Sequence, residues 1–322
     1  MSGPRKRYRY RLRRLTPLVV VVLVAAVAGA WIGARRPTAT LTQAAGQELS
    51  IATPAQHTIA VSVAAPERLL TADSLLPHSF TPGLAAASAI LVDADTGRVI
   101  WGLRDHQRRP VASTTKIMTA LLALKKLGPN DIVTVDKSVP RVPLVREGLR
   151  AGERVPAWKL FYSMLLYSGN DDALALAIAA GGDKWTFLGE MNAEAARLGL
   201  RDTHFASPSG VVDVDNYSSA WDLAALTRVA MQNERFRQIV RTKIERVSWA
   251  PPTNSKIYIN NNLMLRMYPG TNGVKTGYTH KAGWCLVVSA KRHGVTLIAV
   301  VLNSRDMYND ATRLLNFGFS AA

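Results

Sequence analysis

Ser113 and Lys116 have the residue types and the spacing of a catalytic nucleophile and its base. The apolar run 117–124 that follows them has helical periodicity and ends at Gly128-Pro129, which predicts a helix with Ser113 in its first turn. Residues three apart share a helix face, so Lys116 would lie beside the Ser113 hydroxyl. A lysine in a dry pocket gives up its proton more readily and could activate that hydroxyl. An isolated Ser-x-x-Lys is more often an N-cap serine followed by a solvated lysine, so other motifs must decide.

A second motif, Ser168-Gly169-Asn170, places two more polar side chains in a short connection between two helix-periodic segments. The second of these segments is rich in alanine, and we expect Asp171 and Asp172 to cap it. A Ser-Gly-Asn connection taken alone is typical of a turn.

A third motif, Lys275-Thr276-Gly277, is expected to begin a strand that leads to Trp284. Its glycine would let a substrate backbone lie close to the strand edge. Its hydroxyl and ammonium groups could hold a carboxylate. As an isolated tripeptide it indicates little.

The combination of the three motifs is far more informative than any one of them. They occur at 113, 168 and 275, in the order shared by penicillin-binding proteins and class A β-lactamases. The chain resembles the serine-type D-alanyl-D-alanine carboxypeptidases, the low-molecular-mass penicillin-binding proteins. The resemblance extends from about Ala85 to Phe319, and Ser-Gly-Asn is the form of the second motif in this branch.

This resemblance implies an acyl-transfer reaction on a peptidoglycan stem peptide. Ser113 would attack the carbonyl of the penultimate D-alanine, with Lys116 as its general base, and release the terminal D-alanine. Ser168, with Lys275, would return the proton to the leaving amine. Water would then hydrolyse the acyl-enzyme, and β-lactams would trap Ser113 by mimicking the substrate.

The same resemblance implies how the substrate would be held. Asn170 would contact the substrate amide and Lys116. Thr276 and Lys275 would bind the terminal carboxylate, beside Gly277 on the strand edge. The backbone N–H groups of Ser113 and Tyr278 would form the oxyanion hole.

Three alternative functions are weighed against the carboxypeptidase. A β-lactamase would need a deacylating glutamate on a loop, whereas Glu190 and Glu194 fit a predicted helix over 184–198. A DD-endopeptidase would use the same residues as a carboxypeptidase and stays open. A membrane-anchored cell-wall-binding protein without catalysis is disfavoured, because a binder needs neither Ser113 nor Lys116.

Composition excludes several other classes of function. The net charge is +17, but nine cations and no acidic residue lie within residues 1–36, so residues 37–322 carry +8. Without aromatic residues interleaved in a basic patch, we expect no nucleic-acid binding. Cys285 is the only cysteine, which precludes an intrachain disulfide, and the scattered histidines predict no metal site and no cofactor.

The N-terminal quarter of the chain predicts export. Residues 1–14 form a basic cytoplasmic leader, 15–34 a transmembrane signal-anchor, and 35–84 an extracytoplasmic linker rich in Ala, Thr, Pro and Ser. We therefore expect a single-pass protein of the cell membrane with its catalytic domain, 85–322, outside. Cleavage at Ala28-Gly29-Ala30 would instead give a secreted protein.

The expected fold class is α/β (α+β): an antiparallel sheet flanked by helices, with a mainly helical subdomain inserted. Hairpins over 89–101 and 284–302 stand at the two ends of the catalytic domain. Between them we expect a helix over 219–232 and a strand over 239–247, and a last helix over 307–317. Phe205–Gly210 is expected to be a structural loop, and Arg305 is a candidate partner for the substrate carboxylate.

Overall fold

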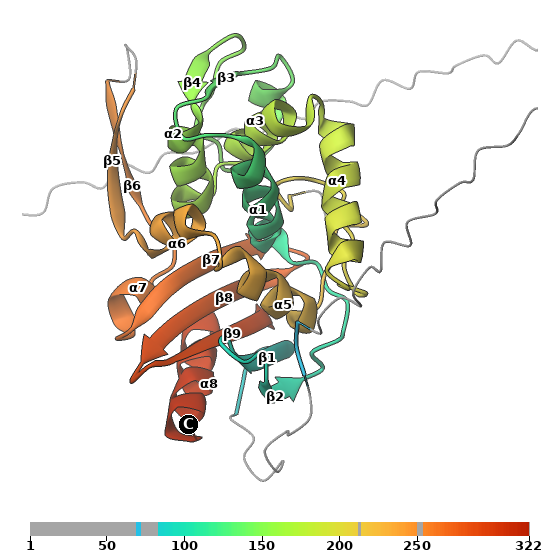
Figure 1. Ribbon diagram of the computed structural model, residues 1–322, viewed down its shortest axis with the longest axis vertical. Helices are drawn as coiled ribbons and strands as arrows, with labels where there is room; N and C mark the ends of the chain where they lie inside the picture. The colour runs from blue at the N-terminus through green and yellow to red at the C-terminus, as the bar shows by residue number, and fades with distance from the viewer. Residues whose placement is uncertain (1–68, 72–82, 212–213, 250–253, 322) are drawn as a thin grey trace, which may run out of the picture. The chain divides into compact units, whose positions relative to one another are not determined.

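The computed structural model describes residues 69–71, 83–211, 214–249 and 254–321, all within one compact unit, Val61–Ala322 (Figure 1). The predicted leader and membrane span, and almost all of the predicted linker, lie outside the described residues. No helix in the described ranges is both long and apolar enough to cross a bilayer.

A five-stranded antiparallel sheet in the order β2-β1-β9-β8-β7 forms the centre of this unit. Hairpin β1–β2 comes from the start of the domain and hairpin β8–β9 from its end, and β1 joins them by pairing with β9. The antiparallel sheet built from the two predicted hairpins is thereby confirmed. The strands are β1 (Ser88–Asp93), β2 (Val99–Leu103), β7 (Thr271–Thr279), β8 (Gly283–Arg292) and β9 (Val295–Ser304).

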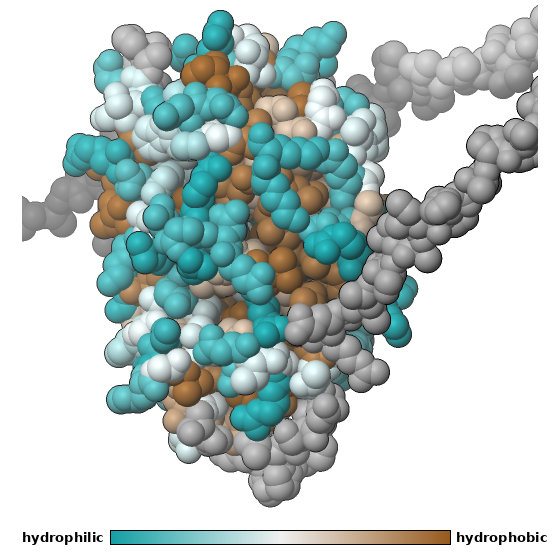
Figure 2. All heavy atoms as spheres, in the orientation of Figure 1, coloured by the Kyte–Doolittle hydropathy of each residue, from teal (hydrophilic) through white to brown (hydrophobic). Residues whose placement is uncertain are grey.

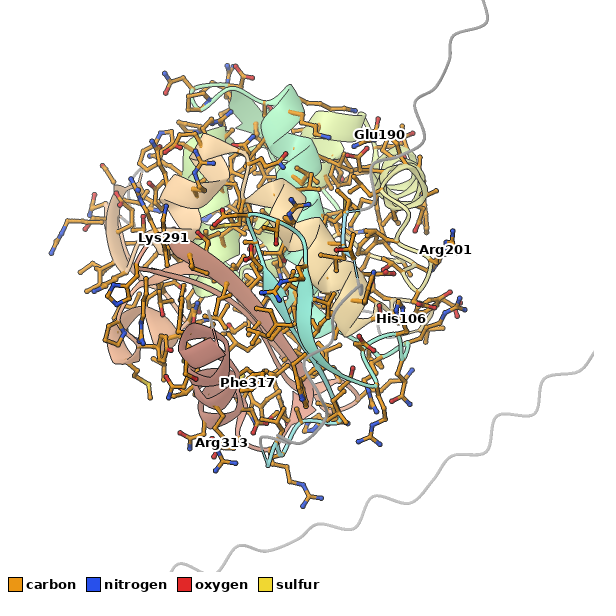
Figure 3. All side chains as sticks on the ribbon, turned by 60° about the horizontal axis from the view of Figure 1, so that its bottom comes forward. His106, Glu190, Arg201, Lys291, Arg313 and Phe317 are labelled. Atoms are coloured by element: carbon orange, nitrogen blue, oxygen red, sulfur yellow. The ribbon has the colours of Figure 1, made fainter. Side chains whose placement is uncertain are left out.

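Each face of the sheet is covered by its own hydrophobic core. On β1, Ile90 and Val92 belong to the core beneath the helical layer, whereas Ala89 and Leu91 belong to the core beneath α8 (Met307–Ala321). This alternation follows from the two-residue period of a strand. Figure 3 shows α8, with Arg313 and Phe317 labelled, against the sheet.

The helical layer on the other face is built mostly from the chain between β2 and β7. It packs around α1 (Lys116–Lys126), whose residues from Lys116 to Leu124 are all buried. The other elements of this segment are η1 (Ala112–Thr115), β3 (Ile132–Thr134), η2 (Val139–Arg141), β4 (Arg154–Pro156), α2 (Ala157–Tyr162), η3 (Ser163–Tyr167), α3 (Asn170–Gly181), α4 (Lys184–Arg197), α5 (Ala220–Ala230), α6 (Glu234–Arg241), β5 (Ile244–Ser248), β6 (Ser255–Ile259) and α7 (Met264–Met267).

The strand predicted over 239–247 is wrong in its first half. Residues up to Arg241 belong to α6, and β5 begins only at Ile244. Asn233 caps α6 by accepting a hydrogen bond from the Phe236 amide, and Phe236, Ile239 and Val240 are buried along one side of the helix. An N-cap and apolar residues three and four apart favour the helix over a strand.

Candidate active site

Ser113 lies in a tight 3-10 turn, η1, that directly precedes α1. We predicted it in the first turn of the helix itself, so the structure corrects its local conformation. Ala112 has a φ of 48°, in the left-handed region, which redirects the chain just before the serine. Edge strand β7 passes so close that a Cβ on Gly277 would lie 2.9 Å from the Ser113 nitrogen. The glycine therefore permits this contact between strand and turn.

Lys116 is fully buried, and its Nζ is surrounded by oxygen atoms. Nζ lies 2.8 Å from Ser113 Oγ and 2.8 Å from Asn170 Oδ1. The carbonyl oxygen of Ser209 is 3.1 Å away, and Ser168 Oγ is 3.5 Å away. An ammonium has three donors and cannot accept a proton. A neutral amine could donate to the two carbonyl oxygens and keep its lone pair for the Ser113 hydroxyl.

The electrostatic surroundings of Lys116 favour that neutral amine. Burial lowers the pKa of Lys116 well below its ordinary value, and the positive charge of Lys275 lowers it further. The carboxyl groups of Asp172 and Asp171 act in the opposite direction but do not reverse the shift. Lys116 thus has both the contacts and the depressed basicity of a general base.

The Ser168-Gly169-Asn170 segment joins the end of η3 to the start of α3. Ser168 has a φ of 77°, a left-handed conformation that is uncommon for a residue other than glycine. Asn170 is held at both ends of its amide, because Oδ1 contacts Lys116 and Nδ2 donates to the carbonyl oxygen of Pro143 at 3.0 Å. The loop thereby presents a hydroxyl and a fixed amide to the same lysine.

The prediction that Asp171 and Asp172 cap α3 is wrong. The N-cap residue is Gly169, and no side chain caps this helix. Instead, the buried Asp171 carboxylate accepts hydrogen bonds from the backbone amides of Glu147, Gly148 and Leu149, at 2.8, 2.8 and 3.2 Å. Asp171 therefore ties the segment that precedes β4 to the first turn of α3, where Asn170 lies.

Asp172 belongs to a second buried network behind the site. Ser163 Oγ lies 2.5 Å from Asp172 Oδ2 and 2.8 Å from Glu147 Oε2, and Lys256 pairs with Glu147. One hydroxyl carries one proton, so it cannot donate to two carboxylates. Burial, and secondarily the charge of Asp171, raises the pKa of Asp172 well above its ordinary value. A protonated Asp172 that donates from Oδ2 to Ser163, which donates to Glu147, gives each proton one acceptor, whereas Asp172 Oδ1 has no hydrogen-bond partner among the described residues.

The Lys275-Thr276-Gly277 motif lies in the middle of β7, whereas we predicted it at the start of a strand leading to Trp284. Trp284 belongs to β8 and pairs with Tyr278. Lys275 is buried, its Nζ donates to the carbonyl oxygen of Thr276 at 3.0 Å, and burial lowers its pKa to about 7. Near neutral pH, Lys275 is therefore a mixture of its protonated and neutral forms.

A pocket of about 400 Å³ opens onto these groups. Ser113, Ser168 and the edge residues Thr276, Gly277 and Tyr278 line it, whereas Lys116, Asn170 and Lys275 lie behind its wall. Tyr278 and Trp284, whose ring centroids are 4.3 Å apart, form part of the lining. The structure therefore brings the predicted residues of all three motifs to one pocket or to the layer behind it.

Arg305 is the exception among the predicted residues. It is exposed directly after β9 and is not one of the side chains that line the pocket. Arg266, which sequence reasoning did not single out, does line it, as do Asn260 and Asn261. Within the described residues, no cluster of His, Cys, Asp and Glu could hold a metal ion.

Comparison with known proteins matches residues 78–306 to the D-alanyl-D-alanine carboxypeptidase family, peptidase family S11. The chain belongs to this family. It is 33% identical to a D-alanyl-D-alanine carboxypeptidase of Bacillus subtilis over 73% of this chain and 62% of that protein. It therefore spans less than two thirds of that relative.

Two other relatives bear different names. A D-alanyl-D-alanine endopeptidase of Escherichia coli is 31% identical over 72% of this chain and 77% of that protein. The crystal structure of the Streptomyces K15 DD-transpeptidase is 35% identical, with a TM-score of 0.71, and the match covers 75% of this chain and 99% of that one. This likeness confirms the predicted fold class.

One contact in this family member was missed by sequence reasoning. We assigned the Phe205–Gly210 loop a structural role only, but its Ser209 carbonyl contacts the Lys116 amine. A Cβ on Gly210 would lie 1.9 Å from the carbonyl oxygen of Ala112, so this loop packs directly on the turn that holds Ser113. A backbone carbonyl has no signature in the sequence, although the glycine that permits its approach does.

Proposed function

We propose that this protein is a membrane-anchored serine D-alanyl-D-alanine carboxypeptidase that removes the terminal D-alanine of peptidoglycan stem peptides. The arrangement of oxygen atoms around Lys116 Nζ is the observation that carries the proposal. It gives the Ser113 hydroxyl a base at 2.8 Å, closer than the second hydroxyl, Ser168 Oγ, at 3.5 Å. Family membership supplies the substrate class.

The reaction begins when Lys116 takes the Ser113 proton as Oγ bonds to the penultimate carbonyl carbon. Negative charge on the carbonyl oxygen would be stabilised by the backbone N–H groups of Ser113 and Tyr278. Such preorganised donors contribute a rate factor of roughly 10²–10³ each.

Collapse of this intermediate breaks the C–N bond to the terminal D-alanine. The leaving nitrogen needs a proton, and Ser168, with its Oγ 3.5 Å from Lys116 Nζ, can relay the one that Lys116 holds. Lys116 then regains its neutral form. It can activate a water molecule to hydrolyse the Ser113 ester, which restores the enzyme.

Substrate binding falls to residues of β7 and to Asn170 at the start of α3. Thr276 and the charge of Lys275 would hold the terminal carboxylate, and Asn170 the substrate amide. A β-lactam offers a carboxylate and a strained amide with the same spacing, so it should acylate Ser113 and inhibit the enzyme.

Two features support anchoring at the outer face of the cell membrane. Residues 15–34 contain an uncharged run, and the basic residues before it outnumber those after it. The substrate class, peptidoglycan, also lies outside the membrane. Fractionation of cells should recover the chain with membranes, and recovery from the culture fluid would favour cleavage of the leader instead.

Endopeptidase activity is the second candidate, because a family relative carries that name and the same residues would serve. The two activities differ in the group released from the scissile bond, which is a single D-alanine in one and a cross-linked stem in the other. Incubation of the full-length chain with a pentapeptide and with a cross-linked dimer separates them. We expect release of D-alanine from the pentapeptide to be faster.

Intact-mass measurement after incubation with benzylpenicillin tests the chemistry itself. We expect one long-lived adduct on the wild-type chain and none on Ser113→Ala. Absence of an adduct on the wild-type chain would favour a binding protein without catalysis. Rapid turnover of nitrocefin would identify a β-lactamase.

A further inference from the structure

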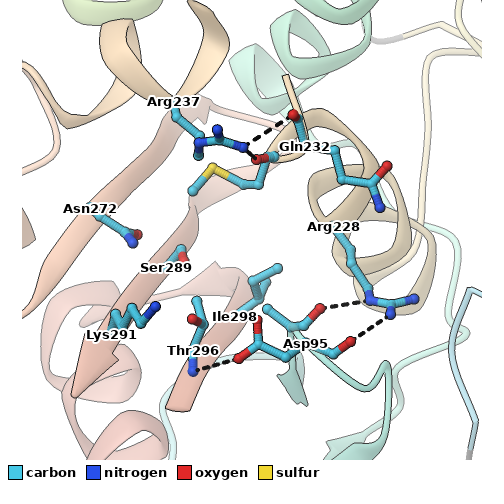
Figure 4. A pocket seen from close by; sticks show the side chains of 11 residues that line it. Asp95, Arg228, Gln232, Arg237, Asn272, Ser289, Lys291, Thr296 and Ile298 are labelled. Atoms are coloured by element: carbon cyan, nitrogen blue, oxygen red, sulfur yellow. Dashed lines mark hydrogen bonds between the residues drawn. The ribbon is translucent and has the colours of Figure 1, made fainter. Parts of the chain in front are cut away.

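A second pocket, of about 420 Å³, lies at the start of β7, before the Lys275-Thr276-Gly277 motif (Figure 4). Its floor is the helical side of the sheet, with Asn272 on β7, Ser289 on β8 and Ile298 on β9. Its walls come from the end of α5, from α6 and from the turn between β1 and β2. It shares no lining residue with the pocket at Ser113.

Two oxygen atoms in the lining lack a hydrogen-bond partner within the described chain. They are Ser289 Oγ, on a residue that is 0% exposed, and Asn272 Oδ1. Both residues line the pocket. A buried polar atom without a partner is costly, and natural proteins rarely keep one that no ligand or water satisfies. The floor of this pocket is therefore incomplete without a molecule that offers donors.

The walls carry an excess of positive charge. Arg228, Arg237 and Lys291 line the pocket, against Asp95 as the only acidic lining residue among those described. The Arg228 guanidinium donates to the backbone oxygens of Ala94 and Asp95 (Figure 4) and also to that of Leu69. It forms no ion pair with a carboxylate of the described residues.

Lys291 is the cationic side chain of the lining that is available to a ligand. Arg237 pairs with Glu234, but no hydrogen bond or ion pair engages the Lys291 ammonium among the residues described. Lys291 lies two residues beyond Ser289 on β8, hence on the same face of the sheet. Hydrophilic side chains also cover the surface over α6 and the strand ends below it (Figure 2).

We propose that this pocket binds a small carboxylate that carries an N–H donor beside it. The carboxylate would face the Lys291 ammonium, and the donor would face Ser289 Oγ and Asn272 Oδ1. A bare anion such as phosphate fits less well, because an amide oxygen accepts hydrogen bonds and cannot donate them. The volume lies within the range of small-molecule pockets.

Two sources share this chemistry: a free amino acid, with an ammonium donor, and the C-terminal residue of a peptide, with an amide donor. The proposal depends on the lining of this pocket and not on the reaction at Ser113. A failure of either leaves the other standing.

Isothermal titration calorimetry on the full-length Ser113→Ala chain in detergent tests the proposal, with alanine and N-acetylalanine (D and L forms) as ligands. We expect saturable binding of at least one of them. Lys291→Gln should weaken it by about tenfold or more, because a charge-assisted contact is lost. Lys243→Gln, at an exposed lysine before β5, should leave the affinity unchanged. Tighter binding of alanine indicates a free amino acid, and tighter binding of N-acetylalanine a peptide end.

Ser289→Ala provides a second and independent reading. It should weaken binding about threefold to tenfold. Without ligand, it should leave the thermal unfolding midpoint unchanged or raise it, because the hydroxyl has no internal partner to lose. The proposal would be overturned if neither ligand binds, or if Lys291→Gln leaves the affinity unchanged. A lowered midpoint of Ser289→Ala together with unchanged affinity would also overturn it, since the hydroxyl would then be structural.

Discussion

Polar groups are buried in different ways at the start of β7, around Asn272, and farther along it, around Lys275 and Gly277. Around Lys275 and Gly277, the buried side chains find partners within the protein: Lys116 contacts four oxygen atoms, and Lys275 donates to a backbone carbonyl. Around Asn272, a serine hydroxyl and an amide oxygen remain without partners in the described chain, beside the Lys291 ammonium. The strand thus joins a site completed by its own side chains to a site that a ligand would complete.

The difference matters because the two ends have different tasks. A catalytic site must hold its dipoles in place before the substrate arrives, since reorganisation during the reaction costs rate. A binding pocket can leave donors and acceptors unpaired and recover that cost when the ligand binds. We therefore expect substitutions at the catalytic end to affect chemistry and those at the other end to affect affinity alone.

Among substitutions that only change packing at the catalytic end, Gly277→Ala should have the largest effect. The new methyl group would lie 2.9 Å from the Ser113 nitrogen and 3.1 Å from Ala112 Cβ, so the turn and the strand must separate. Misplacement of reacting groups by about 1 Å can cost roughly a hundredfold in rate. We expect acylation by fluorescent penicillin to slow by about that factor.

Gly189→Ala is the matched control, because a Cβ there meets no atom within 4 Å on the exposed side of α4. It should acylate at the wild-type rate and gain about 0.5–1 kcal/mol of stability from helix propensity. Equal acylation rates for Gly277→Ala and Gly189→Ala would contradict the close packing at Ser113.

A smaller but diagnostic effect is expected from the two neighbouring aspartates. Asp171→Asn weakens three hydrogen bonds to backbone amides and should lower the free energy of unfolding by about 2–4 kcal/mol. Asp172→Asn replaces a carboxyl group whose raised pKa favours its neutral form, so it should cost less than about 1 kcal/mol. Urea unfolding of both variants measures the difference, and equal losses would refute the assigned protonation.

The protonation of Asp172 also predicts the direction in which stability changes with pH. The folded state keeps a proton on Asp172 that the unfolded state loses above its ordinary pKa, so this group makes stability fall as pH rises toward the raised pKa. Asp172→Asn should remove that slope. A wild-type slope that persists in this variant would place the proton elsewhere.

The subtlest prediction concerns the charge of Lys275. Its pKa of about 7 means that the amine is protonated below that pH and neutral above it. If the ammonium holds the substrate carboxylate, kcat/KM should fall by about tenfold per unit as pH rises above 7. Lys275→Arg stays charged over this range, so its decline should vanish or move to higher pH. A decline unchanged in Lys275→Arg would assign it to another group.

The sequence was sufficient for the hairpins and for the motif residues, because strand alternation, turn residues and spacing are local properties. It misassigned Asp171, since an acidic residue at a helix start looks like a cap whether it binds its own helix or a distant loop. It also missed Ser209, whose contribution is a backbone oxygen placed by tertiary packing. The unpartnered oxygens of Asn272 and Ser289 lie on two neighbouring strands, β7 and β8, and no local sequence pattern records that pairing.

The basicity of Lys116 is tested most directly by the rate at which penicillin acylates Ser113 in Lys116→Met, followed by intact mass. Removal of a general base should slow acylation by about 10²–10⁴-fold. Lys125→Met, on the exposed side of the same helix, should acylate like the wild-type chain, and circular dichroism should show both variants folded. A folded Lys116→Met chain that acylates within a few-fold of wild type would contradict the role of this amine.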